Sequence, residues 1–393
     1  MSELSYLEKL LDGVEVEWLP LGEVSALRRG RVMSKGYLTE NFGPYPVYSS
    51  QTANNGKIGS INTFDFDGEY ISWTTDGANA GTVFYRTGKF SITNVCGLIT
   101  LKSKYPLIYK FLFYWLTIEA KKHVYSGMGN PKLMSHQVEN IPVPIPCPDN
   151  PEKSLAIQSE IVRILDKFTA LTAELTAELT AELNMRKKQY NYYRDQLLRF
   201  KEGEVEWKTL GEVAQYSKTR ISFELLDERN YVGVDNLLQN RAGKSLSNHV
   251  PTSGKLTEFI PNDILIGNIR PYLKKIWQAD CIGGTNGDVL VIRCIDSSIN
   301  TRYLYQILAD DKFFEYNMQH AKGAKMPRGS KEDIMKYPIP VPPLTWQARI
   351  VEILDKFDTL TNSITEGLPR EIELRQKQYE YYRDLLFSFP KPE

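Results

Sequence analysis

The sequence predicts a mixed α/β protein in which two unlike domains are separated by two long antiparallel helices, with an internal pseudo-twofold repeat. Three observations predict this fold: a helical segment that occurs twice, a short motif that precedes each domain, and intervening stretches in which short β-rich runs alternate with apolar helical ones. With 393 residues, of which 42% are hydrophobic and 24% charged, the chain is long enough for two domains with sizeable cores.

The internal repeat is the strongest of these signals. Residues 157–200 align without a gap to residues 346–389, with 23 identities over 44 positions. The same offset of 189 residues carries the motifs EVEW and LGEV at 15–18 and 21–24 onto identical motifs at 204–207 and 210–213. The chain therefore contains two copies of one unit, in which a variable stretch of about 130 residues lies between an opening motif and a long helical segment.

The repeat is circularly arranged. Residues 6–11 (YLEKLL) resemble residues 193–198 (YRDQLL), which precede the second opening motif, so the chain begins with the tail of a repeat. Two copies related by a pseudo-twofold axis complete each other at their ends. We therefore expect the N-terminal helix to lie beside the C-terminal segment 381–389.

Both long segments are predicted to be helices. Apolar residues recur every three or four positions from Ile161 to Leu183, and no Pro or Gly interrupts the first copy. A helix of this length spans about 66 Å, so its apolar seam needs a partner, and we expect the second copy to pack antiparallel to it. Gly367 and Pro369 predict a kink or a restart in the second copy, because Pro lacks an amide donor.

Three identical TAEL units, 172–175, 176–179 and 180–183, stand inside the first helix. Each unit adds about 6 Å of helix and turns the leucine seam by about 40°. Such a composition is also common in helices that are merely stable. Because the units lie between two duplicated domains, we interpret them as a spacer that sets the separation and twist of its two ends.

The repeat divides the chain into five segments. We expect an N-terminal helical segment (1–18), a first domain (19–150), a central helical spacer (151–207), a second domain (208–345) and a C-terminal helical spacer (346–393). Each domain ends in a Pro-rich string, 141–144 or 337–340. We expect these strings to be extended linkers into the helices, because alternating prolines exclude helix.

The two domains share a layout although their sequences have diverged. Pro131-Lys132 precedes the first Pro-rich string as Pro327-Arg328 precedes the second. Runs typical of strands and apolar helical stretches alternate in both domains, which predicts related α/β folds. The strand-like runs are 70–73, 82–85, 264–266 and 289–292, and the helical stretches are 105–118 and 301–317.

The net charge of the chain is zero, but the charge is unevenly distributed. Residues 19–150 hold 13 Lys and Arg against 9 Asp and Glu, and residues 208–345 hold 18 against 15. Both domains are therefore slightly basic on an acidic frame, and a local positive charge is what contact with nucleic acid requires. An excess this small is also consistent with chance.

Polar loops of both domains supply candidate DNA-contacting residues. Asn, Gln and Arg pair bidentately with base edges, whereas Lys more often contacts phosphate. For any one of these residues, a solvated loop side chain is the simpler interpretation. The candidates are Arg28, Arg29, Arg31, Lys35, Ser50, Gln51, Asn54, Lys57, Thr75, Asn79, Lys132, Asn268, Arg270, Lys274, Lys275, Lys325 and Arg328.

We find no sequence motif for catalysis or for a metal site. Gly243-Lys244-Ser245 lacks the earlier glycine of a phosphate-binding loop. Asp65, Asp67 and Glu69 suggest a metal-dependent nuclease, but no Lys follows two residues after Glu69, and the FDFDGEY context favours a hairpin turn. The histidines and cysteines have no ligand or triad spacing. We therefore expect no catalytic and no metal-binding residue.

The chain shows no signal for export or for a membrane. No stretch reaches the roughly 18 apolar residues that a membrane span needs, and residues 1–13 lack the apolar core of a signal peptide. The four cysteines are scattered and are expected to be reduced thiols. We therefore expect a cytoplasmic protein.

The frame of the chain resembles the specificity subunit of type I restriction-modification enzymes, in particular its TAEL-repeat branch. The segments that carry the resemblance are SYLEKLLDGVEVEWLPLGE, the TAEL helix, KKQYNYYRDQLL, FKEGEVEWKTLGE and the C-terminal repeat that ends in YYRDLLFSF. The resemblance implies that 19–150 and 208–345 are target recognition domains, each of which binds one half of an asymmetric bipartite site in double-stranded DNA. The variable domains resemble the family only in layout.

The resemblance also implies partners. The helical frame would dock two modification (methyltransferase) subunits and, through them, restriction (translocase/endonuclease) subunits. The chain itself would hold no cofactor, because S-adenosylmethionine, ATP and Mg²⁺ would bind to the partner subunits. In the TAEL branch the number of repeats is associated with spacer length, so three copies suggest the longer spacer.

Two alternatives stay open at the level of the sequence. The chain could be a stand-alone DNA-binding protein, or a specificity subunit that serves methylation only; stable and tight DNA binding by the lone chain would favour the former. It could also be a nuclease with its own active site, which magnesium-dependent cleavage by the isolated chain would reveal.

Overall fold

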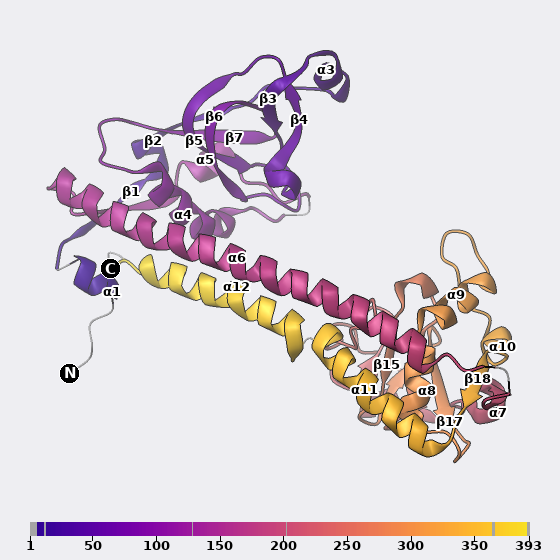
Figure 1. The fold of residues 1–393 in the computed structure, drawn as a ribbon. Coiled ribbons are helices and arrows are strands. Elements are labelled where there is room, and N and C mark those ends of the chain that lie inside the picture. The colour runs from indigo at the N-terminus through magenta and orange to yellow at the C-terminus, as the bar shows by residue number, and fades with distance from the viewer. Residues whose placement is uncertain (1–5, 12, 128, 202, 364–365, 391–393) are drawn as a thin grey trace. The chain divides into compact units, whose positions relative to one another are not determined.

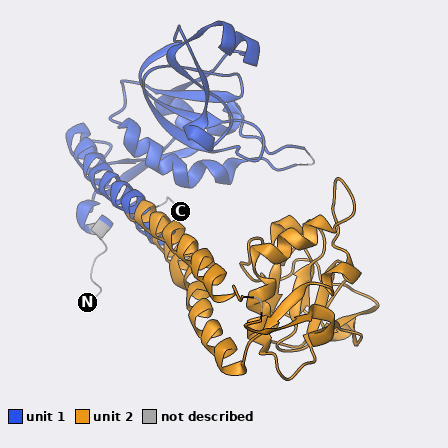
Figure 2. Ribbon diagram, turned by 45° about the vertical axis from the view of Figure 1, so that its right-hand side comes forward, with its two compact units in different colours: residues 1–174, 376–393 blue, residues 175–375 orange. Residues whose placement is uncertain are grey.

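The computed structural model describes the chain apart from residues 1–5, 12, 128, 202, 364–365 and 391–393. The chain divides into two compact units, drawn in separate colours in Figure 2. Unit 1 contains residues 1–174 and 376–393, and unit 2 contains residues 175–375. Residues 1–5 of the expected N-terminal segment and 391–393 of the expected C-terminal one lie outside the described residues.

A six-stranded sheet forms the centre of unit 1 (Figure 1). Its strands are β2 (Ser25–Arg29), β3 (Phe42–Tyr48), β4 (Lys57–Ile61), β5 (Phe66–Thr74), β6 (Val83–Ile92) and β7 (Cys96–Leu101). Their order is β2-β7-β5-β6-β3-β4, and neighbours are antiparallel except β3 and β6, which are parallel. The predicted strands at 70–73 and 82–85 are confirmed as parts of β5 and β6.

Within residues 19–150 of unit 1, the α-helices are short except for one that covers the sheet. They are α2 (Leu21–Val24), α3 (Lys35–Glu40), α4 (Tyr109–Glu119) and α5 (Ser135–Val138). Phe111 and Trp115 of α4 share one buried cluster with Ile71 and Trp73 of β5, so α4 packs against one face of the sheet. This helix overlaps the stretch 105–118 that the sequence predicts to be helical, beginning four residues later and ending one residue beyond it.

The two chain ends meet inside unit 1. Leu7 and Leu11 of α1 (Tyr6–Leu11) belong to the same buried cluster as Leu386, Phe387 and Phe389 near the C-terminus. Figure 1 shows α1 next to the C-terminal end of the chain. The predicted proximity of the N-terminal helix and the C-terminal segment is therefore confirmed.

Unit 2 repeats the first sheet and adds a second one. One sheet has the order β10-β17-β14-β15, with β10 (Ala214–Tyr216), β17 (Val289–Cys294), β14 (Ile264–Gly267) and β15 (Ile276–Gln278). The other has the order β11-β13-β16-β12, with β11 (Arg220–Ser222), β13 (Lys255–Phe259), β16 (Gly283–Thr285) and β12 (Tyr231–Val232). The order of the first sheet matches β2-β7-β5-β6 of unit 1, which bears out a related α/β layout.

Apart from the long helices, the α-helices of unit 2 are α7 (Leu210–Val213), α8 (Thr301–Leu308), α9 (Asp311–Gln319) and α10 (Lys331–Ile334). The prediction of one helical stretch over 301–317 is wrong, because the stretch is divided between α8 and α9. Asp310 stands between them and accepts a hydrogen bond from the amide of Lys312 at 2.8 Å, so it starts a new helix as an N-cap.

The EVEW motifs lie in strands and not in the expected helical segments, whereas the LGEV motifs form α2 and α7. Trp18 lies in β1 (Val16–Pro20), which pairs antiparallel with β8 (Pro142–Pro146), and Trp207 lies in β9 (Glu206–Thr209), which pairs with β18 (Pro338–Val341). The Pro-rich strings are extended, as expected, but they are strands of small two-stranded sheets and not free linkers. Prolines are tolerated there because each such strand pairs on one side only.

The FDFDGEY segment is not the predicted hairpin turn. Gly68 lies inside β5, opposite Gly88 of β6, and the connection between the two strands is residues 75–82. The prediction of a turn was wrong because Asp and Gly, which favour turns, also occur in the exposed and twisted part of a long pair of strands.

The long helices match the duplicated segments. The first is α6 (Pro151–Leu197), which begins where the side chain of Asn150 accepts the amide of Lys153 at 3.0 Å. The second copy is divided into α11 (Leu344–Asn362) and α12 (Gly367–Leu386). Gly367 has a φ of +77°, so the predicted restart near Gly367 and Pro369 is confirmed.

The two copies pack antiparallel through equivalent contacts in each unit. In unit 1, Thr169 Oγ1 donates to the hydroxyl of Tyr379 at 3.1 Å, and the Phe168 and Tyr382 rings are 5.5 Å apart. In unit 2, the residues related by the repeat make the corresponding contacts. The hydroxyl of Tyr190 donates to Asp358 Oδ1 at 3.4 Å, and the ring centres of Tyr193 and Phe357 are 5.4 Å apart. The helix pairing that the repeat predicts is therefore present.

Within the described residues, no helix is both long enough and apolar enough to cross a membrane.

Candidate nucleic-acid interface

In unit 1, several loops meet along one edge of the six-stranded sheet. The amide of Thr75 donates to Val95 O (3.2 Å), and the carbonyl of Thr75 accepts the amide of Leu133 (2.9 Å). Ser50 Oγ donates to Asp76 O at 2.8 Å. We name this edge rim 1, and it consists of the loops 49–57, 75–82 and 93–95 and of the described residues of 125–134.

Unit 2 has a corresponding edge. The amide of Asn268 donates to Asp288 O (2.8 Å), and the carbonyl of Asn268 accepts the amide of Gly329 (3.2 Å). The amide of Arg270 donates to Pro327 O at 2.7 Å. We name this edge rim 2, and it consists of the loops 268–275, 286–288 and 321–329.

The two rims correspond at the level of single backbone bridges. Asp76 bridges to Lys132 in rim 1, and Ile269 bridges to Arg328 in rim 2. The shared Pro-Lys and Pro-Arg pairs therefore occupy the same structural position in both units. The side chains that this shared backbone carries are different, so the two rims present different chemistry on one framework.

Most of the sequence-predicted candidates lie on these rims, and many are exposed. Arg29 Nη1 donates to Asn94 O (3.3 Å), which connects the end of β2 to rim 1. Arg28 lies within β2 and Lys35 begins α3, and no side-chain hydrogen bond within the described part ties either to a rim loop. The exposed candidates are Arg28, Arg31, Lys35, Asn54, Lys57, Lys132, Arg270, Lys325 and Arg328, and the half-buried ones are Arg29, Ser50, Gln51, Asn79 and Lys274.

Three candidates are buried and do not present their side chains to solvent. Thr75 is 0% exposed, and its hydroxyl donates to Val95 O at 2.9 Å. Lys275 is 8% exposed and donates to Val234 O, and burial lowers the pKa of its ammonium. Asn268 is 5% exposed. These residues support the rims from beneath.

Several exposed cations are paired with carboxylates that a DNA phosphate can replace. Arg31 contacts Asp65 at 3.1 Å, and a hydrogen bond to Tyr37, together with Asp65, raises the pKa of Arg31. Arg328 contacts Asp288 at 2.7 Å. Such exposed pairs contribute only about 0–1 kcal/mol, so exchanging the carboxylate for a phosphate costs little.

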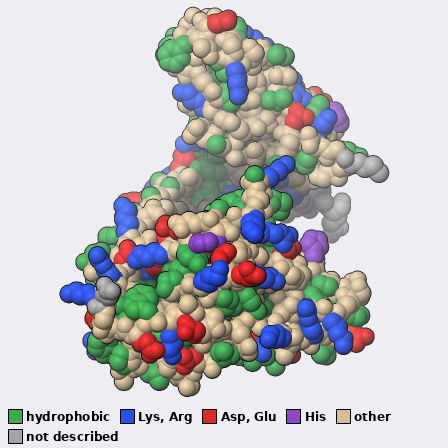
Figure 3. All heavy atoms as spheres, turned by 90° about the vertical axis from the view of Figure 1, so that its right-hand side faces the viewer, with side chains coloured by type: hydrophobic (Ala, Val, Ile, Leu, Met, Phe, Trp, Pro, Cys, Tyr) green, Lys and Arg blue, Asp and Glu red, His purple; other side chains and the backbone are tan. Residues whose placement is uncertain are grey.

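The surface charge of unit 2 is mixed. Figure 3 shows Lys and Arg side chains interspersed with Asp and Glu rather than gathered in one patch. Broad non-specific attraction to a polyanion needs a large basic field, which this face does not have. Contact with DNA would therefore rest on a few placed cations at the rims.

Sequence reasoning missed two residues of this region. Arg86 in β6 is 3% exposed and lies beneath loop 49–57. Asn317 in α9 is 1% exposed, and its amide atoms have no hydrogen-bond partner among the described residues. A Cβ added at Gly329 would come 2.2 Å from Asn317 Oδ1, so rim 2 closes tightly over this amide. Neither residue stands in a motif, so no sequence signal marks it.

The described residues contain no group of three or more His, Cys, Asp or Glu side chains that could hold a metal ion. The three carboxylates of FDFDGEY face separate partners: Asp65 contacts Arg31, Asp67 lies 4.0 Å from Lys89, and Glu69 accepts the hydroxyl of Tyr85 at 2.5 Å. They do not converge on one cation site.

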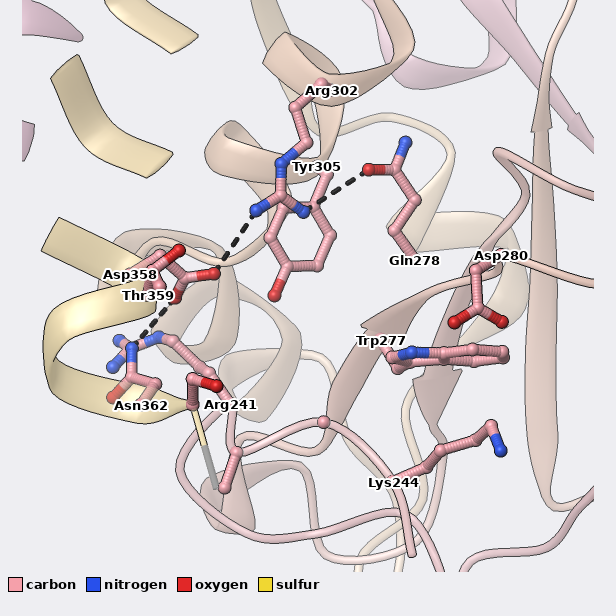
Figure 4. Close-up of a pocket in the computed structure, with 13 residues that line it drawn as sticks. Arg241, Lys244, Trp277, Gln278, Asp280, Arg302, Tyr305, Asp358, Thr359 and Asn362 are labelled. Atoms are coloured by element: carbon pink, nitrogen blue, oxygen red, sulfur yellow. Dashed lines mark hydrogen bonds and ion pairs between the residues drawn. The ribbon is translucent and has the colours of Figure 1, made fainter. Parts of the chain in front are cut away.

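The Gly243-Lys244-Ser245 segment borders a cavity of about 400 Å³ in unit 2, shown in Figure 4. Lys244 Nζ donates to Arg229 O at 2.7 Å and lies 5.2 Å from the centre of the Trp277 ring. Across the cavity, Arg302 contacts Asp358 at 3.2 Å. Lys244 therefore contacts groups of its own domain and does not lie in a phosphate-binding loop at the start of a helix.

Relatives identify the kind of protein that carries this frame. Residues 13–185 and 202–374 each match the family described as type I restriction modification DNA specificity domain. The specificity subunit of the type I restriction enzymes EcoR124I and EcoR124II of Escherichia coli is 42% identical over 428 residues, covering 100% of this chain and 99% of that protein. The EcoprrI specificity subunit of Escherichia coli is 38% identical over 406 residues, covering 93% of each chain.

Solved structures of low sequence identity have the same fold. The S subunit of a type I restriction-modification system from M. genitalium has a TM-score of 0.52 and 16% identity, covering 97% of this chain and 98% of that one. A chain from work on complex assembly and conformational transition of the type I R-M system has a TM-score of 0.57 and 16% identity. The match covers 95% of this chain and 97% of that one. The chain therefore belongs to the type I restriction-modification DNA specificity family, whose subunits recognise DNA and are not themselves catalytic.

Proposed function

We propose that rim 1 and rim 2 each recognise one half of an asymmetric, bipartite site in double-stranded DNA, with a spacer between the halves that neither rim contacts. The observation that supports this is a duplicated frame that carries two unlike rims. Where rim 1 has Asp76 and Lys132, rim 2 has Ile269 and Arg328 at the corresponding positions. Unlike donors and acceptors pair with unlike bases, so the two half-sites should differ.

The domain boundaries belong to this proposal. The first recognition domain would be 19–150 and the second 208–345, joined by the spacers 151–207 and 346–393 and preceded by the segment 1–18. The family match extends from each domain into the helix that follows it, which supports treating each domain and its helix as one repeated unit.

The helical frame would dock two modification subunits, one for each copy of the repeat. Aromatic pairs repeated on α6 and α12 support this number. Tyr192 is 61% exposed and Tyr381, its repeat equivalent, is 63% exposed, and exposed aromatic side chains are typical of protein interfaces. The modification subunits would bring S-adenosylmethionine, and the restriction subunits attached through them would bring ATP and Mg²⁺. A cytoplasmic location would follow, because the DNA lies there.

Mapping of methylated adenines tests this function directly. The chain is expressed with its modification subunits in cells that lack other adenine methylation, and the methylated positions are determined across the genome. We expect two unlike half-sites at a fixed separation. A contiguous or palindromic recognition site would contradict two unlike rims.

Purification separates the remaining alternatives. Tight and specific DNA binding by the lone chain, without modification subunits, would favour a stand-alone DNA-binding protein. Cleavage of DNA by the isolated chain with Mg²⁺ would favour a nuclease. We expect neither outcome, because the face of unit 2 in Figure 3 has no large basic field for tight binding alone, and the carboxylates of the FDFDGEY segment face separate partners.

A further inference from the structure

Arg86 is a buried cation without a carboxylate partner. It lies in β6, is 3% exposed, and forms no salt bridge within the described residues. Its guanidinium stacks 3.6 Å from the centre of the Tyr48 ring, and Nε donates to Ser72 Oγ at 3.0 Å. Burial lowers the pKa of Arg86 to about 10, so it remains charged at neutral pH. A buried charge without a counter-ion reduces the stability of a fold.

Arg86 contacts loop 49–57, which carries the rim 1 candidates Ser50, Gln51, Asn54 and Lys57. Nη1 donates to the carbonyl of Asn55 at 2.8 Å. Asn54 and Asn55 have φ angles of 50° and 54°, a left-handed conformation that needs support from its surroundings. A Cβ added at Gly56 would come 3.0 Å from Nη2, so the turn sits directly on the guanidinium.

Unit 2 has a similar arrangement made from a different residue. The loop after β12 corresponds to loop 49–57, because β12 pairs in parallel with β16 as β3 does with β6. Lys275 is also buried and forms no salt bridge within the described residues. Its ammonium group donates a hydrogen bond to Val234 O in that loop. Two unlike cations, Arg86 inside β6 and Lys275 just before β15, therefore contact the corresponding loop in each unit.

We propose that Arg86 and Lys275 are positioning residues for DNA recognition: Arg86 holds loop 49–57 of rim 1, and Lys275 ties the rim 2 loop 268–275 to the loop after β12, each by a charge-assisted hydrogen bond to a loop carbonyl. The proposal rests on the proposed function of the rims. Because a buried cation of this kind lowers stability and contacts the main chain of a loop, we infer that its role is to hold the conformation of that loop. Neither side chain reaches the surface, so each acts through the loop and not by touching phosphate.

Arg86→Met and Lys275→Met test the proposal in the complex with the modification subunits. The probes are duplexes that carry the mapped site of the wild-type chain, with one half-site or the other scrambled. We expect Arg86→Met to lose about tenfold or more of the discrimination at the half-site of unit 1 only, and Lys275→Met to do so at the other half-site only, since one well-placed base contact accounts for a change of this size.

Two further readouts separate positioning from other roles. The unfolding temperature of each variant should stay within about 3 °C of the wild type or rise, because an unpaired buried charge is removed. The slope of binding affinity against salt concentration should be unchanged, whereas Lys57→Gln, in the same loop but exposed, should reduce it by about one. A reduced slope for Arg86→Met would assign it a direct phosphate contact and overturn the proposal.

Gly56→Ala tests the contact from the loop side in case Arg86→Met does not fold. It places a methyl group against the guanidinium and should cause the same loss at the same half-site. Folded variants with wild-type discrimination, or equal losses at both half-sites with a lowered unfolding temperature, would overturn the proposal. If the wild-type complex itself fails to distinguish the mapped site from the scrambled duplexes, the proposed function fails instead.

Discussion

At the scale of residues, two buried glutamines attach the recognition domains to their helices. Gln158 Oε1 accepts the amide of Ile108 at 2.9 Å, and Nε2 donates to Pro106 O at 2.7 Å. Its repeat equivalent, Gln347, accepts the amide of Asn300 at 2.8 Å. Both glutamines are 0% exposed. One amide side chain thus satisfies a donor and an acceptor of the loop that leads into each domain helix.

Gln158→Leu should destabilise unit 1. The substitution puts an apolar side chain of similar volume in place of the amide and leaves the half-buried Ile108 amide and Pro106 carbonyl without this partner. Each unsatisfied group costs about 1–3 kcal/mol, so we expect a loss of about 2–5 kcal/mol, seen as a lower unfolding temperature by calorimetry. Ser159→Ala, at the exposed neighbouring position, is the matched control and should have no measurable effect. A wild-type unfolding temperature for Gln158→Leu would contradict the role given to this amide.

Single residues mark the limit of what the sequence can predict. Lys274 and Lys275 are adjacent and identical in kind, and both are candidates for phosphate contact. Lys274 is half-buried and contacts Asp311 at 2.8 Å, whereas Lys275 is enclosed. Which of two neighbouring lysines faces inward depends on strand register and on the loop above it. Arg86 could not be found for the same reason, because only the fold places loop 49–57 over it.

At the scale of elements, local signals predict breaks better than pairings. Gly367 predicts that the helix breaks and starts again there, and the structure confirms this. The prediction succeeds because tolerance of a left-handed φ and the missing Cβ are properties of glycine itself. Asp310 could have predicted the break between α8 and α9, because Asp is a preferred N-cap residue. The apolar periodicity of 301–317 favoured one continuous helix instead. The pairing of β1 with β8 joins residues more than a hundred positions apart and has no local signal.

Gly367→Ala should disturb the junction between α11 and α12. A Cβ there would come 2.5 Å from Thr359 O, and the residue must also hold its φ of +77°. A left-handed non-glycine residue costs about 1–3 kcal/mol, and the close carbonyl adds to this. Gly254→Ala is the control, because its φ is +92° and nothing lies within 4 Å of the added Cβ. In hydrogen exchange, we expect faster exchange around 359–370 in Gly367→Ala only; equal behaviour of the two variants would show that the carbonyl contact is unimportant.

At the scale of the whole molecule, the repeat accounts for most of what the sequence could predict. Two copies of one unit dictate equivalent contacts, and the Thr169–Tyr379 and Tyr190–Asp358 pairs are equivalent. The rims are less predictable, because recognition requires the two domains to differ there. The candidate residues could be found as polar loop residues, but which of them are exposed, paired or buried depends on packing between loops distant in sequence.

The TAEL units lie within one uninterrupted helix, α6, in which Leu175, Leu179 and Leu183 are half-buried. If this helix sets the separation of the two half-sites, its length must appear in the DNA that is methylated. Deleting residues 176–179 removes about 6 Å of helix and rotates the C-terminal part of α6 by about 40° relative to its N-terminal part.

Base pairs are stacked about 3.4 Å apart, so the deletion should shorten the spacer by one or two base pairs. Both half-sites should stay unchanged, because no residue of either rim is altered. Methylation mapping of cells that carry the deletion, side by side with Glu178→Gln as a length-preserving control, measures spacer and half-sites together. An unchanged spacer would refute the helix as the determinant of distance, and altered half-site bases would show that the deletion acts on the rims instead.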